Sequence, residues 1–282
     1  MLREQKATHR LKVRGLIVFL VALLSLVCRS QAQATDSRLS SSSSQSSVSL
    51  PDAISRVSSG KVLVPDLELI AEAKAVEEVP MLESAFKATQ DPKVKEKIAS
   101  TLVRLGDRDV SYWSFLVDKV NTILGSDAPD SISYVEQGRE AGISPEFVAW
   151  SQSHGLTLQV AIVDQTLVYP GTILELGLTG DKRAIPLLRR SLLSPNRLVQ
   201  HAAALGLAEF NDKDSIPLIV EACRRSPAKV AEELATSLIF FDDPEAKSQV
   251  EKYVPANVAS IIRTAHAAGY SPLGQRQVER QQ

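Results

Sequence analysis

Apolar side chains recur along this chain at an interval of 31 residues. Copies beginning at Val168, Val199 and Val230 follow one another directly, and a further copy begins at Val94. Within a copy, offsets 0, 8 and 11 are mostly apolar and share one face of a 3.6-residue helix, with offset 5 on its flank. The pattern predicts a helix with one buried side. Its central position is the leucine column Leu102, Leu176, Leu207 and Leu238.

A second helix is predicted in each unit, because proline recurs where helices begin. Pro80, Pro186 and Pro217 each precede a short apolar run, and proline suits the first helical turn, where its missing N–H costs nothing. The pairs Asp91-Pro92, Ser194-Pro195 and Ser226-Pro227 introduce the next helix with an N-cap residue followed by proline. One such helix pair cannot bury its apolar face alone. The fold class predicted is therefore all-α, an α-solenoid of stacked antiparallel helix pairs.

The turn sequences resemble those of HEAT-like repeats of the short, bilin-lyase type. LGDRD at 105–109, TGDKRAIPLL at 179–188 and FNDKDSIPLI at 210–219 carry the likeness, and DPKVK at 91–95 is similar to the family's opening of the second helix. The resemblance is best over 168–253 and looser over 66–107. It implies a superhelical stack over residues 65–270, with the second helix of each pair lining a concave side.

The stretch 108–167 departs from the repeat. It begins as a helix and continues as a segment rich in Asp, Ser, Pro and Gly. Two interpretations stay open: two degenerate repeats with one long loop, or an insertion that places Tyr134, Phe147 and Trp150 on a binding face. After it the repeats resume, Ala256 to Ala268 forms a last amphipathic helix, and residues 271–282 form a polar tail.

The N-terminal segment 1–34 has the order of a secretory signal peptide. Basic residues precede the uncharged run from Leu16 to Cys28, and Ala32-Gln33-Ala34 provides a cleavage site. The apolar run is about 20 Å long as a helix, short of a bilayer core of about 30 Å. We expect export by the Sec pathway to a periplasm or the exterior, with an uncleaved anchor as the alternative. Residues 35–64 are rich in serine and predict a disordered linker.

Charge and cysteine content limit the partners. Cleavage after residue 34 would remove six of the 32 Lys/Arg and one of the 33 Asp/Glu. The remaining chain then has a formal net charge of −6. A mildly acidic chain is a poor nucleic-acid binder, and no stable membrane span is expected after cleavage. Cys223 is then the single cysteine, which excludes an internal disulfide and indicates a small buried apolar residue.

No pattern of catalytic, metal-binding or cofactor-binding residues is present in the sequence. The histidines after the signal are His154, His201 and His266, and none is followed by Glu, so neither H-E-x-x-H nor the His-Glu pairs of the HEAT-like di-iron enzymes occur. There is no P-loop, G-x-S-x-G or G-x-G-x-x-G motif. We expect a protein that is not an enzyme and needs no cofactor.

Charged positions on the second helix of each pair are the candidate partner-binding site. They stand at offsets 2, 3 and 10, which point away from the predicted buried seam: Glu96, Lys97, Arg104, His201, Glu209, Glu232 and Glu233. The hypothesis is an exported binding or scaffold module, monomeric or weakly oligomeric, that holds a protein or peptide on this row. A solvated face without function and an enzyme or enzyme-accessory protein using 108–167 are the alternatives.

Overall fold

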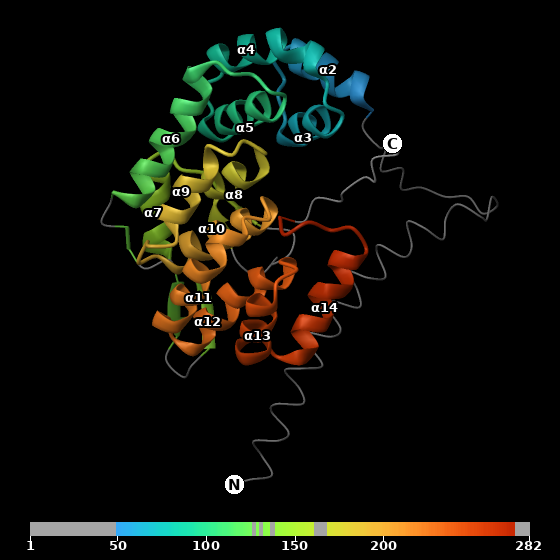
Figure 1. The fold of residues 1–282 in the computed structure, drawn as a ribbon. Helices are drawn as coiled ribbons and strands as arrows, with labels where there is room; N and C mark the ends of the chain where they lie inside the picture. The colour runs from blue at the N-terminus through green and yellow to red at the C-terminus, as the bar shows by residue number, and fades with distance from the viewer. Residues whose placement is uncertain (1–48, 126–127, 130–131, 136–138, 161–167, 274–282) are drawn as a thin grey trace, which may run out of the picture. The chain divides into compact units, whose positions relative to one another are not determined.

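The computed structural model describes residues 49–125, 128–129, 132–135, 139–160 and 168–273 (Figure 1). Of residues 132–135, 139–143, 159–160 and 168 only the backbone is described. The predicted signal peptide and most of the predicted serine-rich linker therefore lie outside the described residues, as does the tail beyond Leu273. No helix in the described part of the chain combines the length and apolarity needed to cross a bilayer.

The folded part begins at Ser49, earlier than the expected boundary at residue 65. Ser49 caps α2 (Leu50–Ser58), whose Ala53 and Val57 are buried. The Arg56 guanidinium and the buried Asp66 carboxylate form an ion pair, which ties α2 to α3 (Val64–Glu72). The linker prediction is therefore wrong for residues 50–58. Serine occupies the exposed positions of this helix, so its composition concealed an amphipathic pattern.

The two helices of each repeat form two packed rows, and the all-α prediction is confirmed. The first helix of a pair belongs to what we call the A row: α4 (Val79–Ala88), α6 (Val110–Leu124), α9 (Ala184–Ser191), α11 (Ile216–Arg225) and α13 (Pro244–Tyr253). The second belongs to the B row, which α3 begins: α5 (Pro92–Arg104), α8 (Gly171–Leu178), α10 (Arg197–Glu209) and α12 (Ala228–Thr236). The elements η1 (Val76–Glu78), η2 (Lys213–Ser215) and η3 (Ser237–Phe240) are single 3₁₀ turns.

The leucine column forms the core between the rows, as the repeat predicted. Leu102, Leu176 and Leu207 are fully buried and Leu238 is 1% exposed. From α5 to α12, each B helix packs against the A helix of its own pair and against a neighbouring B helix. A B helix is therefore covered on more than one side.

The turn that follows a B helix explains the Gly/Asn–Asp part of the repeat. Gly106, Gly180 and Asn211 take positive φ, a conformation that other residues adopt only with strain. The next residue is Asp in every copy. Asp107, Asp181 and Asp243 each accept a hydrogen bond from the backbone N–H two residues later, at 2.8–2.9 Å. In the remaining copy the Asp212 carboxylate instead accepts hydrogen bonds from the side chains of Arg189 and Ser215.

The inserted stretch separates the two helices of one repeat, so the interpretation as two degenerate repeats is wrong. Helix α6 packs beside α5, and α8, its partner in the B row, begins only at Gly171. Between them lie the antiparallel pairs β1 (Ile132–Val135) with β2 (Arg139–Ile143) and β3 (Leu158–Val160) with β4 (Val168–Pro170). Helix α7 (Pro145–Ser153) stands between the two pairs and buries Phe147 in the common core.

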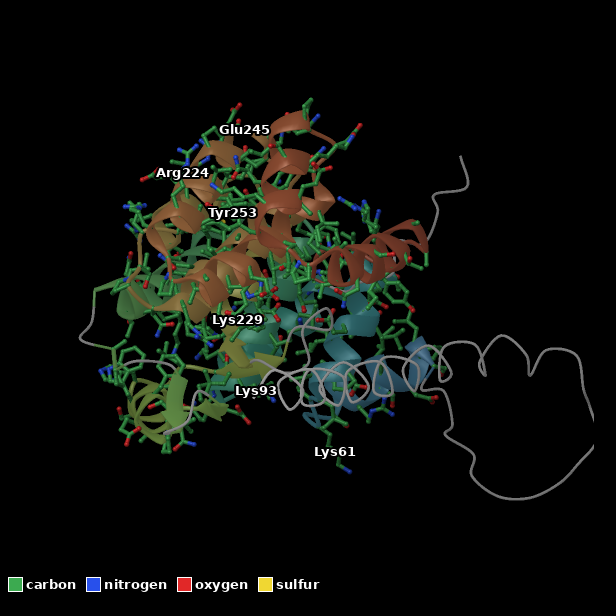
Figure 2. All side chains as sticks on the ribbon, turned by 90° about the horizontal axis from the view of Figure 1, so that it is seen from below. Lys61, Lys93, Arg224, Lys229, Glu245 and Tyr253 are labelled. Atoms are coloured by element: carbon green, nitrogen blue, oxygen red, sulfur yellow. The ribbon has the colours of Figure 1, made fainter. Side chains whose placement is uncertain are left out.

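The C-terminal end returns to the stack. Helix α14 (Ala256–Ala267) confirms the predicted last helix and packs against η3. Ser271, Pro272 and Leu273 are buried, contrary to the expectation of a polar tail from residue 271. Charged side chains such as Lys61, Arg224 and Glu245 lie on the exposed surface (Figure 2).

Candidate functional site: the polar seam of the B row

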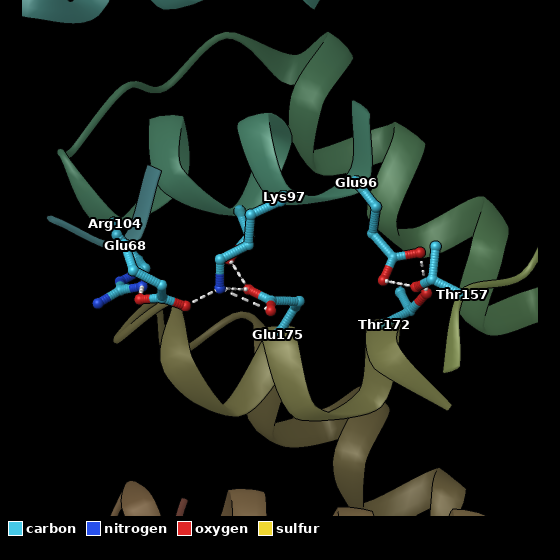
Figure 3. Close-up of polar contacts among 8 residues, drawn as sticks. Glu68, Glu96, Lys97, Arg104, Thr157, Thr172 and Glu175 are labelled. Atoms are coloured by element: carbon cyan, nitrogen blue, oxygen red, sulfur yellow. Dashed lines mark hydrogen bonds and ion pairs between the residues drawn. The ribbon is translucent and has the colours of Figure 1, made fainter. Parts of the chain in front are cut away.

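Helices α3, α5 and α8 meet through charged side chains that are largely withdrawn from solvent (Figure 3). Lys97 Nζ lies 2.7 and 2.9 Å from the two carboxylate oxygens of Glu175, and it also contacts the Glu68 carboxylate. Ser100 Oγ donates to Glu175 Oε2 at 2.6 Å. Lys97 therefore bridges three successive helices of the row. We call the polar groups buried along α3, α5, α8, α10 and α12 the polar seam.

Arg104 completes the charge balance at the α3 side. Its Nη1 lies 2.7 Å from Glu68 Oε2. Burial by itself would raise the pKa of Glu68, but the positive charges of Lys97 and Arg104 outweigh it and hold that pKa below the ordinary value. Glu68 is therefore an anion between two cations, an arrangement that fixes side chains rather than leaving one free to react.

Glu96 has a different environment, because hydroxyl groups surround its carboxyl. Thr157 Oγ1 donates to Oε1 at 2.5 Å and Thr172 Oγ1 donates to Oε2 at 2.8 Å. The pKa of Glu96 is raised to about 7, mainly by burial and to a smaller extent by the nearby Glu175, although the two threonine hydrogen bonds act in the opposite direction. Gly171 makes room for this contact, since a methyl group there would lie 2.9 Å from Glu96 Oε1 and 2.4 Å from Thr157 Oγ1.

The seam continues through α10 and α12 with weaker contacts. The His201 ring nitrogen Nδ1 lies 3.0 Å from the Tyr169 hydroxyl, and Nε2 lies 3.3 Å from Thr236 Oγ1. Arg197 and Glu233 form an ion pair at 3.9 Å. At the end of α10, burial raises the pKa of Glu209, whose carboxylate accepts a hydrogen bond from the Leu273 N–H at 3.3 Å.

Residues 168–239 and 190–269 match HEAT repeats. This part of the chain consists of HEAT repeats. The resemblance inferred from the turn sequences is thus confirmed for α8 to α14. No curated protein matches the chain.

The structure places the seven candidate residues differently from the prediction of an exposed row. Glu96, Lys97, His201 and Glu233 are 2%, 4%, 3% and 9% exposed, so the prediction is wrong for these four. Offsets 2 and 3 do point away from the leucine column, but the next B helix covers that side as well. The apolar pattern of one repeat predicts the helix face that packs against the A row. It does not predict the face that packs against a neighbouring helix of the B row.

Of the other three candidates, Glu209 and Glu232 are partly exposed, whereas the Arg104 side chain is slightly less exposed than that of Glu233. The Arg104 side chain is 9% exposed and the Glu232 side chain 26%, with Lys229 Nζ 3.2 Å from Glu232 Oε1. Glu209 is half-buried under the C-terminal segment. The residues that the sequence reasoning missed are Glu68, Thr157, Thr172 and Glu175, which pair with the candidates. Glu175 at least stood out as a charge within the apolar run TILELGL.

The chemistry open to Glu96, Lys97 and Glu175 is limited, because each is buried and hydrogen-bonded to other side chains. In the described ranges no three His, Cys, Asp or Glu side chains group as metal ligands. A groove of about 750 Å³ lies between α2, α4 and the start of α5, lined by Val57, Met81, Ala85 and Val94 among others. None of the seam residues lines this groove. The seam is therefore arranged to hold successive helices of the B row together.

Proposed function

We propose that the protein is an exported, non-catalytic HEAT-repeat module that binds a protein or peptide partner or acts as a scaffold in the cell envelope or outside the cell. The observation that carries the proposal is the run of HEAT repeats over 168–269, because stacked helical repeats of this kind commonly mediate protein interaction. The N-terminal order of basic, apolar and small residues supports export. The formal charge of −6 after residue 34 favours a partner of basic or mixed charge.

The contacts of Glu96 and Lys97 with other buried side chains support a binding role rather than catalysis. A general acid or base must reach a proton on its substrate within hydrogen-bond distance. Both carboxylate oxygens of Glu96 accept hydrogen bonds from threonine hydroxyls, and the Lys97 ammonium lies between two carboxylates. Thr157 of the insertion donates one of these hydrogen bonds, so the insertion helps to hold the helix stack together.

Export is tested by the mature N-terminus. The chain is produced in a bacterium with a Sec pathway, cells are fractionated, and the protein is sequenced from its N-terminus. We expect a soluble exported form that begins at Thr35. A membrane-bound form that retains Met1 would contradict export by cleavage and favour the uncleaved anchor.

Binding is tested with purified components after co-purification from cells that make the protein. A partner recovered with the mature chain is purified separately and titrated against the wild type. Leu193→Asp changes a leucine that is 66% exposed and serves as a matched control for Leu207→Asp, which places a charge in the fully buried column. We expect saturable binding by the wild type and loss with Leu207→Asp. A partner that binds the unfolded variant equally well contradicts recognition by the stack.

A further inference from the structure

The segment after α14 folds back onto the B row. Gly269 takes φ +87°, and the Tyr270 N–H donates to the Ala265 carbonyl at 3.1 Å, which reverses the chain. In Figure 1 the red loop after α14 runs toward α10. Ser271 and Leu273 are then 1% and 6% exposed and Pro272 between them is also buried, so three residues of an otherwise polar stretch are covered by the fold.

Leu273 lies against Gly177, where two helix glycines let α8 and α10 approach closely. Gly177 of α8 and Gly206 of α10 face each other, and a methyl group at Gly177 would lie 2.8 Å from Gly206 Cα. The same methyl group would lie 2.7 Å from Leu273 Cδ1. Glycine is disfavoured inside helices, so two at one contact indicate a packing requirement. Here the requirement is the close approach of α8 and α10 together with space for the leucine side chain.

A carboxylate at the edge of this surface holds the peptide backbone. Glu209 Oε2 accepts the Leu273 N–H at 3.3 Å, and the Ser271 side chain hydrogen-bonds to the same carboxylate. A backbone N–H is available at every residue except proline, whereas the space beside Gly177 selects an aliphatic side chain. The contact therefore combines a sequence-independent hydrogen bond with one apolar anchor, the usual division in peptide recognition.

The segment is attached through the least buried helix of the stack. Ala259 is the one buried residue of α14, whereas α10 buries eleven of its residues from Arg197 to Ala208. Elements with little buried apolar surface open locally at low free energy. The last helix and the segment that follows it can therefore leave the B row while the rest of the stack stays folded.

We propose that the surface formed by Gly177 and Glu209, beside the close approach of α8 and α10 at Gly206, is a binding site for a peptide segment of a partner, with an aliphatic side chain beside Gly177, and that Ser271–Leu273 occupies it in cis as a built-in competitor. This proposal rests on the proposed protein-binding function and adds the site and the chemistry of the ligand. The chain's own Ser-Pro-Leu is the template for the partner sequence. A segment tethered by a short connection has an effective concentration on the order of millimolar, so a partner binds only by displacing it.

The test uses the full mature chain and a fluorescein-labelled synthetic peptide with the sequence of residues 269–282, followed by fluorescence anisotropy. Leu273→Asp in the protein removes the anchor of the cis segment and frees the site. We expect the labelled peptide to bind this variant about tenfold or more tightly than it binds the wild type. Leu193→Asp, a change at an exposed leucine, should bind as weakly as the wild type. A peptide carrying Leu273→Asp should not bind either protein.

Equal binding by the wild type and Leu273→Asp, or binding by neither, overturns the proposal. A second measurement does not depend on the variant's folding: in the wild type labelled with ¹⁵N-leucine, excess peptide should shift the Leu273 amide signal, and an unchanged signal also overturns it. The partner titration tests the general function separately. A partner that binds the stack while the peptide does not would leave the proposed function in place and remove this site.

Discussion

Replacing Glu96 by Gln should stabilise the protein above neutral pH. The carboxyl is 2% exposed, and burial raises its pKa from 4.5 to about 7. A raised carboxyl pKa means that the folded chain binds the proton more tightly than the unfolded chain. The free energy of unfolding therefore falls as the pH rises from about 4.5 to about 7, and it changes no further through this group at higher pH.

The size of the effect follows from the shift. At about 1.4 kcal/mol for each pKa unit, the ionisation of Glu96 lowers the free energy of unfolding by about 3 kcal/mol across that window. Glutamine keeps the shape and stays neutral, and its amide can still bond to Thr157 and Thr172. We expect Glu96→Gln to match the wild type near pH 4.5 and to exceed it by about 3 kcal/mol at pH 8.

Urea unfolding at several pH values between 4.5 and 8 measures this difference, with equal m-values required for the comparison. Glu232→Gln is the matched control, because Glu232 holds the equivalent repeat position with a side chain that is 26% exposed. The control should leave the pH dependence of the wild type unchanged. A variant Glu96→Gln that is less stable than the wild type at pH 8, or whose difference does not vary with pH, would refute the reasoning.

Three further changes test the packing. Leu207→Ala, in the fully buried leucine column, should lower the free energy of unfolding by about 2–5 kcal/mol; a loss below about 0.5 kcal/mol in denaturant titration would place the column outside the core. Gly177→Ala should lower the free energy of unfolding by about 1–3 kcal/mol although alanine favours helices, because its methyl group would lie 2.8 Å from Gly206 Cα. A variant with a higher free energy of unfolding would show that α8 and α10 can separate. Cys223 is 1% exposed and burial raises the pKa of its thiol to about 12, so iodoacetamide at pH 8 should modify it only after unfolding, and rapid alkylation of the native protein would contradict its burial.

The repeat architecture could be predicted because its signals are local. Leu102 and Leu207 recur with the helical period, and Asp107 and Asp181 serve their own turns, so a single unit contains the information. The start of α2 was also visible in principle, since Leu50, Ala53, Ile54 and Val57 stand at helical spacing behind Ser49. The abundance of serine led to the prediction of a linker instead.

The candidate site could not be predicted, because it depends on contacts between units. Glu96 pairs with Thr157 from the insertion, and Lys97 pairs with Glu175 more than seventy residues away. No periodicity relates such partners, and a charged residue at an offset facing away from the leucine column is ordinarily solvated. The return of Leu273 to α8 is equally invisible in a sequence of twelve mostly polar residues.

The most direct test of the proposed binding function is cross-linking of the full-length chain in the cells that make it, followed by mass spectrometry. We expect cross-links that join residues of the HEAT repeats over 168–269 to one partner protein. These cross-links should be lost when Leu207→Asp disrupts the leucine column. Cross-links confined to the chain itself in every fraction would contradict its role as a binding module.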